Sequence, residues 1–284
     1  MNQSHLNVLW KNNKHNIFGI MICLTLFTAG IIIHGHTGLY MNLSGFVIVV
    51  GGTIGATLIS YKMERLIILC KVLYASYARE LITPNTIVEI LVELSVKRRI
   101  KGLLALQRDE EETTIAFLCQ AIGLMLDGHT QAQIREALNM EMYFFRMRRD
   151  ETGRVLRTMA DVAPSFGLVG SVVGLIGMLA GVGDTNIILS TIPIALTSTL
   201  YGIILSNLFF LPFAAHIREK TAQELLLQKI ITEGVVAIAG DLHPRMLERK
   251  LKSFLTPSER QGNLISLKKI HQQLELFKEP LKSE

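Results

Sequence analysis

Cysteine is scarce in this sequence, and the three that occur are far apart. Cys23, Cys70 and Cys119 form no Cys-x-x-Cys pair and no metal-type spacing, so neither a disulfide framework nor a zinc site organises the fold. We expect three free thiols on apolar helix faces. His34 and His36 are the nearest approach to a metal-binding pair, and a solvated loop is the favoured interpretation for them.

Catalytic motifs are also missing. The sequence contains no glycine-rich nucleotide fingerprint, no cluster of histidines and cysteines at metal-ligand spacing, and no nucleophile elbow. No enzyme class is therefore predicted, and no cofactor is expected. The net charge of +5 does not indicate a nucleic-acid partner, because the basic residues lie beside apolar runs, where lipid headgroups account for them.

Charged residues are absent from four long apolar runs. A run of about 18 residues or more can cross the hydrocarbon core of a bilayer as a helix, and a helix satisfies its own backbone there. We therefore predict an all-α membrane protein with four transmembrane helices. The first run could instead be a signal peptide, but it lacks a convincing cleavage site and a second run follows directly, which favours retention.

Lysine and arginine flank these runs on one side only. The two short connectors, 34–42 and 183–186, contain neither residue, whereas both termini and the long loop after the second run are basic at the membrane edge. The positive-inside rule places those basic parts in the cytoplasm. The predicted segments are a cytoplasmic N-terminus 1–16, span one 17–33, a periplasmic loop 34–42, span two 43–61, a cytoplasmic helical insertion 62–161, span three 162–182, a periplasmic turn 183–186, span four 187–213 and a cytoplasmic tail 214–284.

The insertion is predicted to be helical throughout. Asp109 and Glu110 suit the first turn of a helix, where carboxylates face the positive end of the dipole. Thr130 and Gln133 have the spacing of a capping box before the long helix that enters span three. Charged clusters such as Lys97-Arg98-Arg99 are usually solvated helix faces, but a docking surface for a large partner stays open.

Small residues form a seam along each of the last two spans. At helical spacing, Gly, Ala or Ser residues let a neighbouring backbone approach closely. Two hydroxyls, Ser171 and Thr199, lie on or beside the seams at comparable depth. The seam residues are Gly170, Gly174, Gly177 and Gly181 in span three and Ala195, Gly202 and Ser206, with Thr199, in span four.

No Asp, Glu, Lys or Arg occupies the middle of a predicted span; Asp161 and Asp184 lie at the ends. Ion translocation usually requires an ionisable group within the membrane. Either the chain moves no ion, or a partner supplies the carboxylate and this chain lines it with hydroxyls. Pro164, Pro193 and Pro212 lie near span ends and are candidate bend points.

Several of these segments resemble MotA-type flagellar stator subunits, of the MotA/TolQ/ExbB proton channel family. The resemblance extends from about residue 17 to about residue 220, in family order. It is carried by DVAPSFGLVGSVVGLIGML from Asp161, ALTSTLYG from Ala195 with Ser206, Asn207 and Pro212, GGTIGA from Gly51, GLLAL from Gly102 and DGH from Asp127.

The resemblance implies a bacterial inner-membrane motor part. Such subunits form a ring, thought to be a pentamer, around the membrane helices of two MotB-type partners whose periplasmic domain grips peptidoglycan. The partner's aspartate carries a proton or a sodium ion, and the ring's cytoplasmic loop turns the rotor switch protein FliG. By position, Ser171 and Thr199 would face that aspartate, while Pro164 and Pro212 would couple ion binding to movement.

The chain departs from the family pattern at two places. Arg99, beside Arg98, falls at the rotor-contact arginine, but the downstream acidic position holds Gln107, with Asp109 and Glu110 nearest to it. Asn42 stands where some sodium-driven members have an aspartate, whereas the hydroxyl of Ser171 favours sodium. The two hints conflict, so the sequence leaves the ion open.

Two alternatives are weighed against this interpretation. TolQ/ExbB-type energisers of outer-membrane processes usually have three spans and an external N-terminus, which the predicted topology disfavours. A stand-alone transporter or membrane enzyme would need an intramembrane charge or a catalytic cluster, and the predicted spans contain neither.

Overall fold

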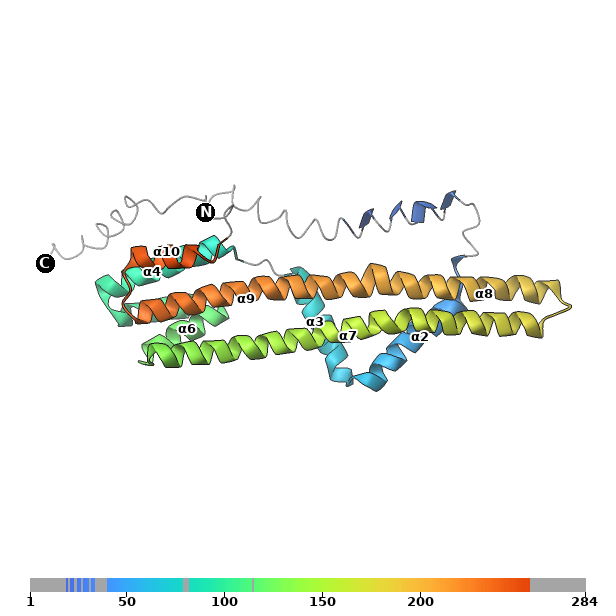
Figure 1. Ribbon diagram of the computed structural model, residues 1–284, viewed down its shortest axis with the longest axis horizontal. Helices are drawn as coiled ribbons and strands as arrows, with labels where there is room; N and C mark the ends of the chain where they lie inside the picture. Colours follow the sequence, from blue (N-terminus) through green and yellow to red (C-terminus); the bar gives the residue numbers. More distant parts are fainter. Residues whose placement is uncertain are drawn as a thin grey trace. The chain divides into compact units, whose positions relative to one another are not determined.

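The computed structural model describes residues 19, 21–22, 25–26, 28–30, 32–33, 40–78, 82–113 and 115–255. Within these ranges all regular secondary structure is helical (Figure 1), which confirms the all-α prediction. The chain forms two compact units. Unit 1 comprises Met1–Glu80 and Met147–Thr221, and unit 2 comprises Leu81–Arg146 and Ala222–Glu284.

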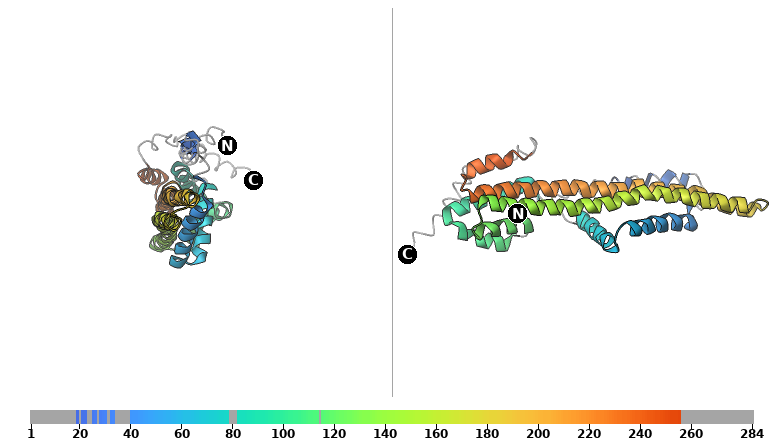
Figure 2. Two further views of the ribbon diagram at one scale, coloured as in Figure 1. Left: turned by 90° about the vertical axis from the view of Figure 1, so that its right-hand side faces the viewer. Right: turned by 60° about the horizontal axis from the view of Figure 1, so that its bottom comes forward.

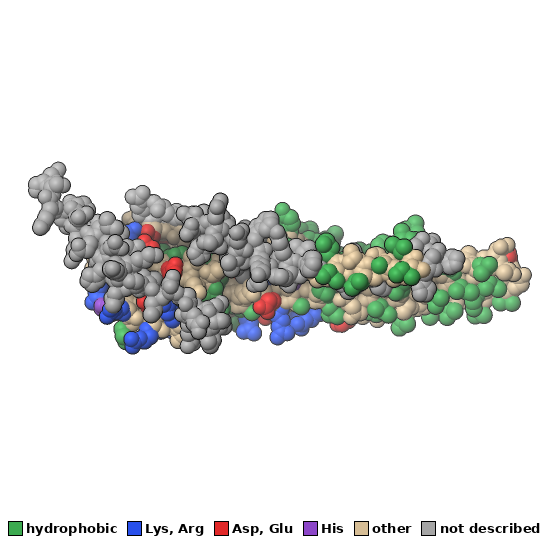
Figure 3. Space-filling view, turned by 90° about the horizontal axis from the view of Figure 1, so that it is seen from above, with side chains coloured by type: hydrophobic (Ala, Val, Ile, Leu, Met, Phe, Trp, Pro, Cys, Tyr) green, Lys and Arg blue, Asp and Glu red, His purple; other side chains and the backbone are tan. Residues whose placement is uncertain are grey.

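Three stretches of helix among the described residues are long and apolar enough to cross a membrane. They are α2 (Leu43–Ser60), α7 (Gln131–Ala180) and the continuous stretch Thr185–Ala239. The third stretch contains predicted span four, whereas predicted spans two and three each extend one or two residues past the end of their helix. Seven of the 17 residues of predicted span one, and the tail from residue 256, lie outside the described residues. Figure 3 shows hydrophobic side chains gathered on the surface of the α7–α8 end, as a lipid-embedded segment requires.

Unit 1 is built from α2, α3 (Met63–Ala78), the C-terminal part of α7, α8 (Thr185–Ile204) and the start of α9 (Leu211–Ala239). Helix α2 begins where the Asn42 side chain accepts a hydrogen bond from the Gly45 N–H at 3.1 Å. It packs on α8 and also meets α7, because Gly52 leaves room for the ring of Phe166. A two-residue link follows, after which α3 leaves at a sharp angle (Figures 1 and 2).

A π-helical turn, η3 (Leu205–Phe210), interrupts predicted span four. The Leu211 N–H reaches back five residues to the Ser206 carbonyl, immediately before Pro212. Proline has no N–H to donate and its ring collides with the carbonyl one turn earlier. A wider turn relieves that collision, and such turns often mark functional positions.

Unit 2 is a helical bundle around one apolar core. Its elements are α4 (Pro84–Lys101), η2 (Leu103–Leu106), α5 (Gln107–Glu112), α6 (Ala116–Leu126), α10 (Pro244–Lys252) and the adjoining parts of α7 and α9. Leu91, Leu106, Ile122, Leu138 and Ile230 are among its fully buried side chains. The core is therefore shared by helices far apart in the sequence.

The helix boundaries of unit 2 follow local chemistry. The predicted capping box is confirmed, since Gln133 Oε1 accepts from the Thr130 N–H at 2.9 Å and Thr130 Oγ1 from the Gln133 N–H at 3.3 Å. Gly102 ends α4 with φ of +81°, a conformation that favours glycine. Asp109 and Glu110 lie in the first turn of α5, as predicted.

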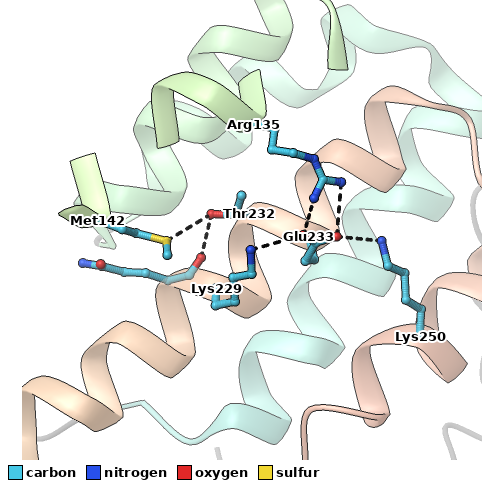
Figure 4. A network of polar contacts seen from close by, with 7 residues as sticks. Arg135, Met142, Lys229, Thr232, Glu233 and Lys250 are labelled. Atoms are coloured by element: carbon cyan, nitrogen blue, oxygen red, sulfur yellow. Dashed lines mark hydrogen bonds and ion pairs between the residues drawn. The ribbon is translucent and has the colours of Figure 1, made fainter. Parts of the chain in front are cut away.

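A buried carboxylate joins three helices of unit 2 (Figure 4). Glu233 on α9 accepts hydrogen bonds from Arg135 on α7, at 2.5 and 3.3 Å, and from Lys250 on α10 at 2.8 Å. Lys229 lies 3.5 Å away. Burial by itself would raise the pKa of Glu233, but the hydrogen bonds and charges of Lys250 and Arg135 outweigh it and lower the pKa to about 2.

We predict that Glu233→Gln destabilises the detergent-solubilised protein at neutral pH by about 1–3 kcal/mol, since three partly exposed cations lose their carboxylate. A carboxyl whose pKa falls on folding stabilises the fold fully above its unfolded pKa, here 4.5, and loses that contribution as the pH falls towards about 2. The difference between variant and wild type, measured by thermal unfolding, should therefore shrink across that window.

Glu89→Gln, at an exposed position on α4, is the matched control and should leave the unfolding temperature unchanged. Equal stability of wild type and Glu233→Gln at pH 7 would contradict the stabilising role.

Candidate functional site

The seam residues of α7 face α8 within this one chain. A Cβ added to Gly174 would lie 2.5 Å from the backbone nitrogen of Ala195, and one on Gly170 would lie 2.5 Å from Ser198 Cβ. Gly177 and Gly181 lie against the side chains of Thr191 and Ile187. The two helices are thus packed almost backbone to backbone, as small residues permit.

Gly202 makes the equivalent contact from α8. A Cβ at this position would lie 2.7 Å from the Ala163 carbonyl oxygen and 3.0 Å from the Pro164 Cα. Because both neighbours are backbone atoms, they cannot yield as the end of a side chain can. The closest approach of α8 to α7 therefore includes the turn of α7 that holds Pro164.

The structure brings Ser171 and Thr199 together across this seam. Their hydroxyl oxygens are 2.5 Å apart, and Ser171 Oγ lies 2.5 Å from the Ala195 carbonyl oxygen and 3.2 Å from that of Gly167. Both side chains are half-buried. The sequence placed the two hydroxyls at similar depth, and the structure adds the shared carbonyl oxygen.

The direction of these bonds follows from counting protons. Ser171 has one hydroxyl proton, and the Ala195 carbonyl, which can only accept, is the nearer of its two carbonyl neighbours. Thr199 then donates to Ser171 Oγ. The result is a compact group of oxygens with no formal charge, which can coordinate a cation or accept a hydrogen bond but cannot itself carry a proton at neutral pH.

The two candidate coupling prolines occupy different backbone environments. Pro164 lies inside α7, so the carbonyl one turn earlier, that of Ala160, lacks its usual donor. Pro212 follows the π-helical turn that contains Ser206, and Ser206 itself is buried. Each proline weakens the helix that connects a predicted span to the helical segment beyond it.

Tyr201 is a site residue that sequence reasoning did not single out. Its hydroxyl donates to the Tyr40 carbonyl and accepts from the Asn42 N–H at 2.9 Å, and its ring meets Phe46 edge to face with centroids 5.9 Å apart. The available signal in the sequence was a phenolic hydroxyl inside predicted span four. These contacts fasten the start of α2 to α8, while the Asn42 side chain caps α2.

The charged residues proposed for rotor contact are separated by the fold. Lys97, which the sequence analysis named only as part of a charged cluster, forms a bidentate pair with Asp109 at 2.6 and 2.7 Å. Arg98 turns inward, and its Nη2 donates to the Ala239 carbonyl at 3.5 Å. Glu110 lies against α6, where its Oε1 is 2.8 Å from the position of a Cβ on Gly123.

Arg99, by contrast, is exposed, and so is Leu104, at 80%. An exposed cation and an exposed leucine are suited to contact with another protein. Among the described residues, no group of three or more His, Cys, Asp or Glu side chains is placed to hold a metal ion.

Known proteins match this chain over most of its length. The profile of the MotA/TolQ/ExbB proton channel family matches residues 109–229. "Chemotaxis protein PomA" of Vibrio alginolyticus is 30% identical over 244 residues, which cover 86% of this chain and 96% of that protein. "Motility protein A" of Borreliella burgdorferi is 33% identical over 223 residues, covering 78% and 86%.

Solved structures match the fold as well. A chain of the C. jejuni MotAB structure superposes with a TM-score of 0.81 at 25% identity, covering 88% of this chain and 99% of that one. A chain of the flagellar MotAB stator complex from Bacillus subtilis gives 0.80 at 25%, covering 86% and 96%. The packed helix pair with its hydroxyl group, and these matches over most of the chain, show that it belongs to the MotA/TolQ/ExbB proton channel family.

Proposed function

We propose that this chain is a flagellar motor stator subunit of the bacterial inner membrane, which with a MotB-type partner converts an ion gradient into torque. The matches to motility proteins and stator complexes over most of the chain support it. The observation that carries the mechanism is the uncharged oxygen group at Ser171 and Thr199, in predicted spans that hold no Asp, Glu, Lys or Arg of their own.

The proposed topology has four spans with both termini in the cytoplasm. The three membrane-length stretches of helix and the apolar run at 17–33 supply the spans. The segment between spans two and three, which contains α3 to α6, then forms a cytoplasmic insertion. An energiser of outer-membrane work of the TolQ/ExbB type is the less favoured function, because the relatives that match most of the chain are motility proteins.

A partner is needed because ion translocation usually requires an ionisable group within the membrane, and the predicted spans of this chain contain no Asp, Glu, Lys or Arg. We place the partner's carboxylate against Ser171 and Thr199. There the two hydroxyls and the Ala195 carbonyl provide oxygens to a passing sodium ion, or acceptors for a proton carrier. The similarity to a chain of the Bacillus subtilis MotAB stator complex supports a MotB-type partner. We propose that five copies of this chain form a ring around that partner, and that the outside of the ring contacts lipid.

Movement would begin at the prolines. Because Gly202 touches the Pro164 turn directly, a shift of α8 when the carboxylate changes charge has to displace that turn. The weakened backbone at Pro164 and at the π-helical turn before Pro212 lets the cytoplasmic continuations of α7 and α9 respond. On the rotor side, exposed Arg99 and Leu104 are the proposed contact with the switch protein FliG.

Complementation of a motility-deficient stator deletion strain, expressing this chain with its cognate partner, tests the function. Swimming should be restored, and comparing media with and without sodium identifies the ion: loss of swimming without sodium means sodium, and persistence means protons. Failure to swim in either medium, despite normal membrane levels of both proteins, would contradict the proposal.

We predict that Thr199→Ala lowers ion flux and swimming speed by about tenfold or more, since removing one of a few coordinating oxygens costs on the order of 1.4 kcal/mol. Assembly should persist because alanine fits the seam. Thr191→Ala is the matched control, as that hydroxyl donates to Ile187 of its own helix. Wild-type speed and flux in Thr199→Ala would remove its role in the ion pathway.

We also predict that Arg99→Glu weakens rotor engagement while membrane insertion and ion flux persist, because the charge is exposed and lies outside the predicted spans. The measurement is recruitment of fluorescent stators to rotating motors. Arg249→Glu, an equally exposed reversal on α10, is the control. Undiminished recruitment in Arg99→Glu would exclude the contact.

A further inference from the structure

Helix α3 contacts α7 and α9 together, on the cytoplasmic side of both prolines. Leu69 is buried in a cluster with Val155 and Leu156 of α7 and with Ala214 and Ile217 of α9. These α7 positions precede Pro164 in the sequence, and the α9 positions follow Pro212. One face of α3 therefore bridges the two segments that would have to move if the prolines act as bend points.

The N-terminal end of α3, together with the link before it, is held to α7 by two polar contacts. The Tyr61 hydroxyl, in the link between α2 and α3, lies 3.0 Å from Thr158 Oγ1. One turn further along, Arg65 forms an ion pair with Glu151. Both partners lie on the cytoplasmic part of α7, about two turns apart, so this end of α3 follows α7.

The C-terminal end of α3 is held to α9 by contacts between aromatic rings. Tyr77 stacks on His216 with centroids 4.2 Å apart and planes 14° apart, and its ring meets Phe213 edge to face at 6.1 Å. Phe213 in turn contacts Phe209, in the π-helical turn, at 6.3 Å. His216 is only 7% exposed and lies one turn after Pro212. A row of rings thus runs from the interrupted part of span four to the end of α3.

We propose that α3 is a tie that makes the cytoplasmic segments of α7 and α9 move as one, with Tyr77 and His216 as its positioning residues. A helix fixed at one end to α7 and at the other to α9 transmits displacement of either, because packed interfaces switch between arrangements rather than stretch. Without the stack, α3 would be held to α9 only by its apolar contacts, and less of the movement at Pro212 would reach α7 through it. This inference rests on the proposed function, since it concerns how ion passage becomes torque.

The test uses the complete complex with its partner and compares Tyr77→Leu and His216→Leu with Tyr77→Phe. Tyr74→Leu is the matched control: it removes a tyrosine from the same helix, one turn away, where the side chain is 78% exposed. Three readouts are measured: hydrogen–deuterium exchange of residues 72–78, ion flux into proteoliposomes, and torque of tethered cells.

Loss of the stacked pair should raise amide exchange in residues 72–78 by about twofold to tenfold, the population change that such a pair can account for. Torque should fall by a similar factor while ion flux stays at the wild-type level. Tyr77→Phe should keep the wild-type torque because the aromatic ring remains, and Tyr74→Leu should behave as wild type.

Unchanged torque in Tyr77→Leu would overturn the proposed tie. An equal fall in torque and ion flux would also overturn it, because such a result indicates a structural defect of the whole complex. An equal loss in Tyr74→Leu would also overturn it. Failure of the proposed function is distinguishable: the wild-type chain would then not restore motility at all, whereas the exchange measurement needs no rotating motor.

Discussion

The backbone contact between α7 and α8 is the constraint on which the rest of the site depends. Gly174 and Gly202 bring the two helices together at positions where any Cβ would collide with main-chain atoms of the other helix. That approach places the hydroxyls of Ser171 and Thr199 within hydrogen-bonding distance. It also sets Gly202 against the Pro164 turn, so the proposed ion site and bend point share one interface.

The chemistry of that interface explains the need for a partner. Hydroxyl and carbonyl oxygens can guide a cation, but they do not titrate near neutral pH, and the predicted spans contain no carboxylate. Carrying an ion in steps requires a group whose charge changes. A partner's carboxylate in this position would alter the local electrostatics each time it is neutralised, and the two proline-weakened helices give the chain a way to respond.

Much of this could be predicted from the sequence. Apolar runs, capping at Thr130 and Gln133, and the glycine spacing depend on local patterns. In the structure the seam glycines of α7 lie against α8, and Gly202 of α8 lies against α7. Long-range side-chain pairing could not be predicted. That Lys97 pairs with Asp109, that Arg98 turns towards Ala239, and that Tyr77 stacks on His216 all depend on how separate helices pack. The π-helical turn was equally inaccessible, because Pro212 permits either a kink or a widened turn.

Cross-linking at the hydroxyl pair tests the central claim most directly. Ser171→Cys is co-expressed with its partner carrying single cysteines along the transmembrane helix, in a background without Cys23, Cys70 and Cys119. Val172→Cys, the next residue along α7, whose side chain makes none of the hydroxyl contacts of Ser171, is the control. The account predicts a disulfide between Ser171→Cys and partner positions next to its carboxylate, and none from Val172→Cys. Cross-linking from position 172 but not from 171 would contradict it.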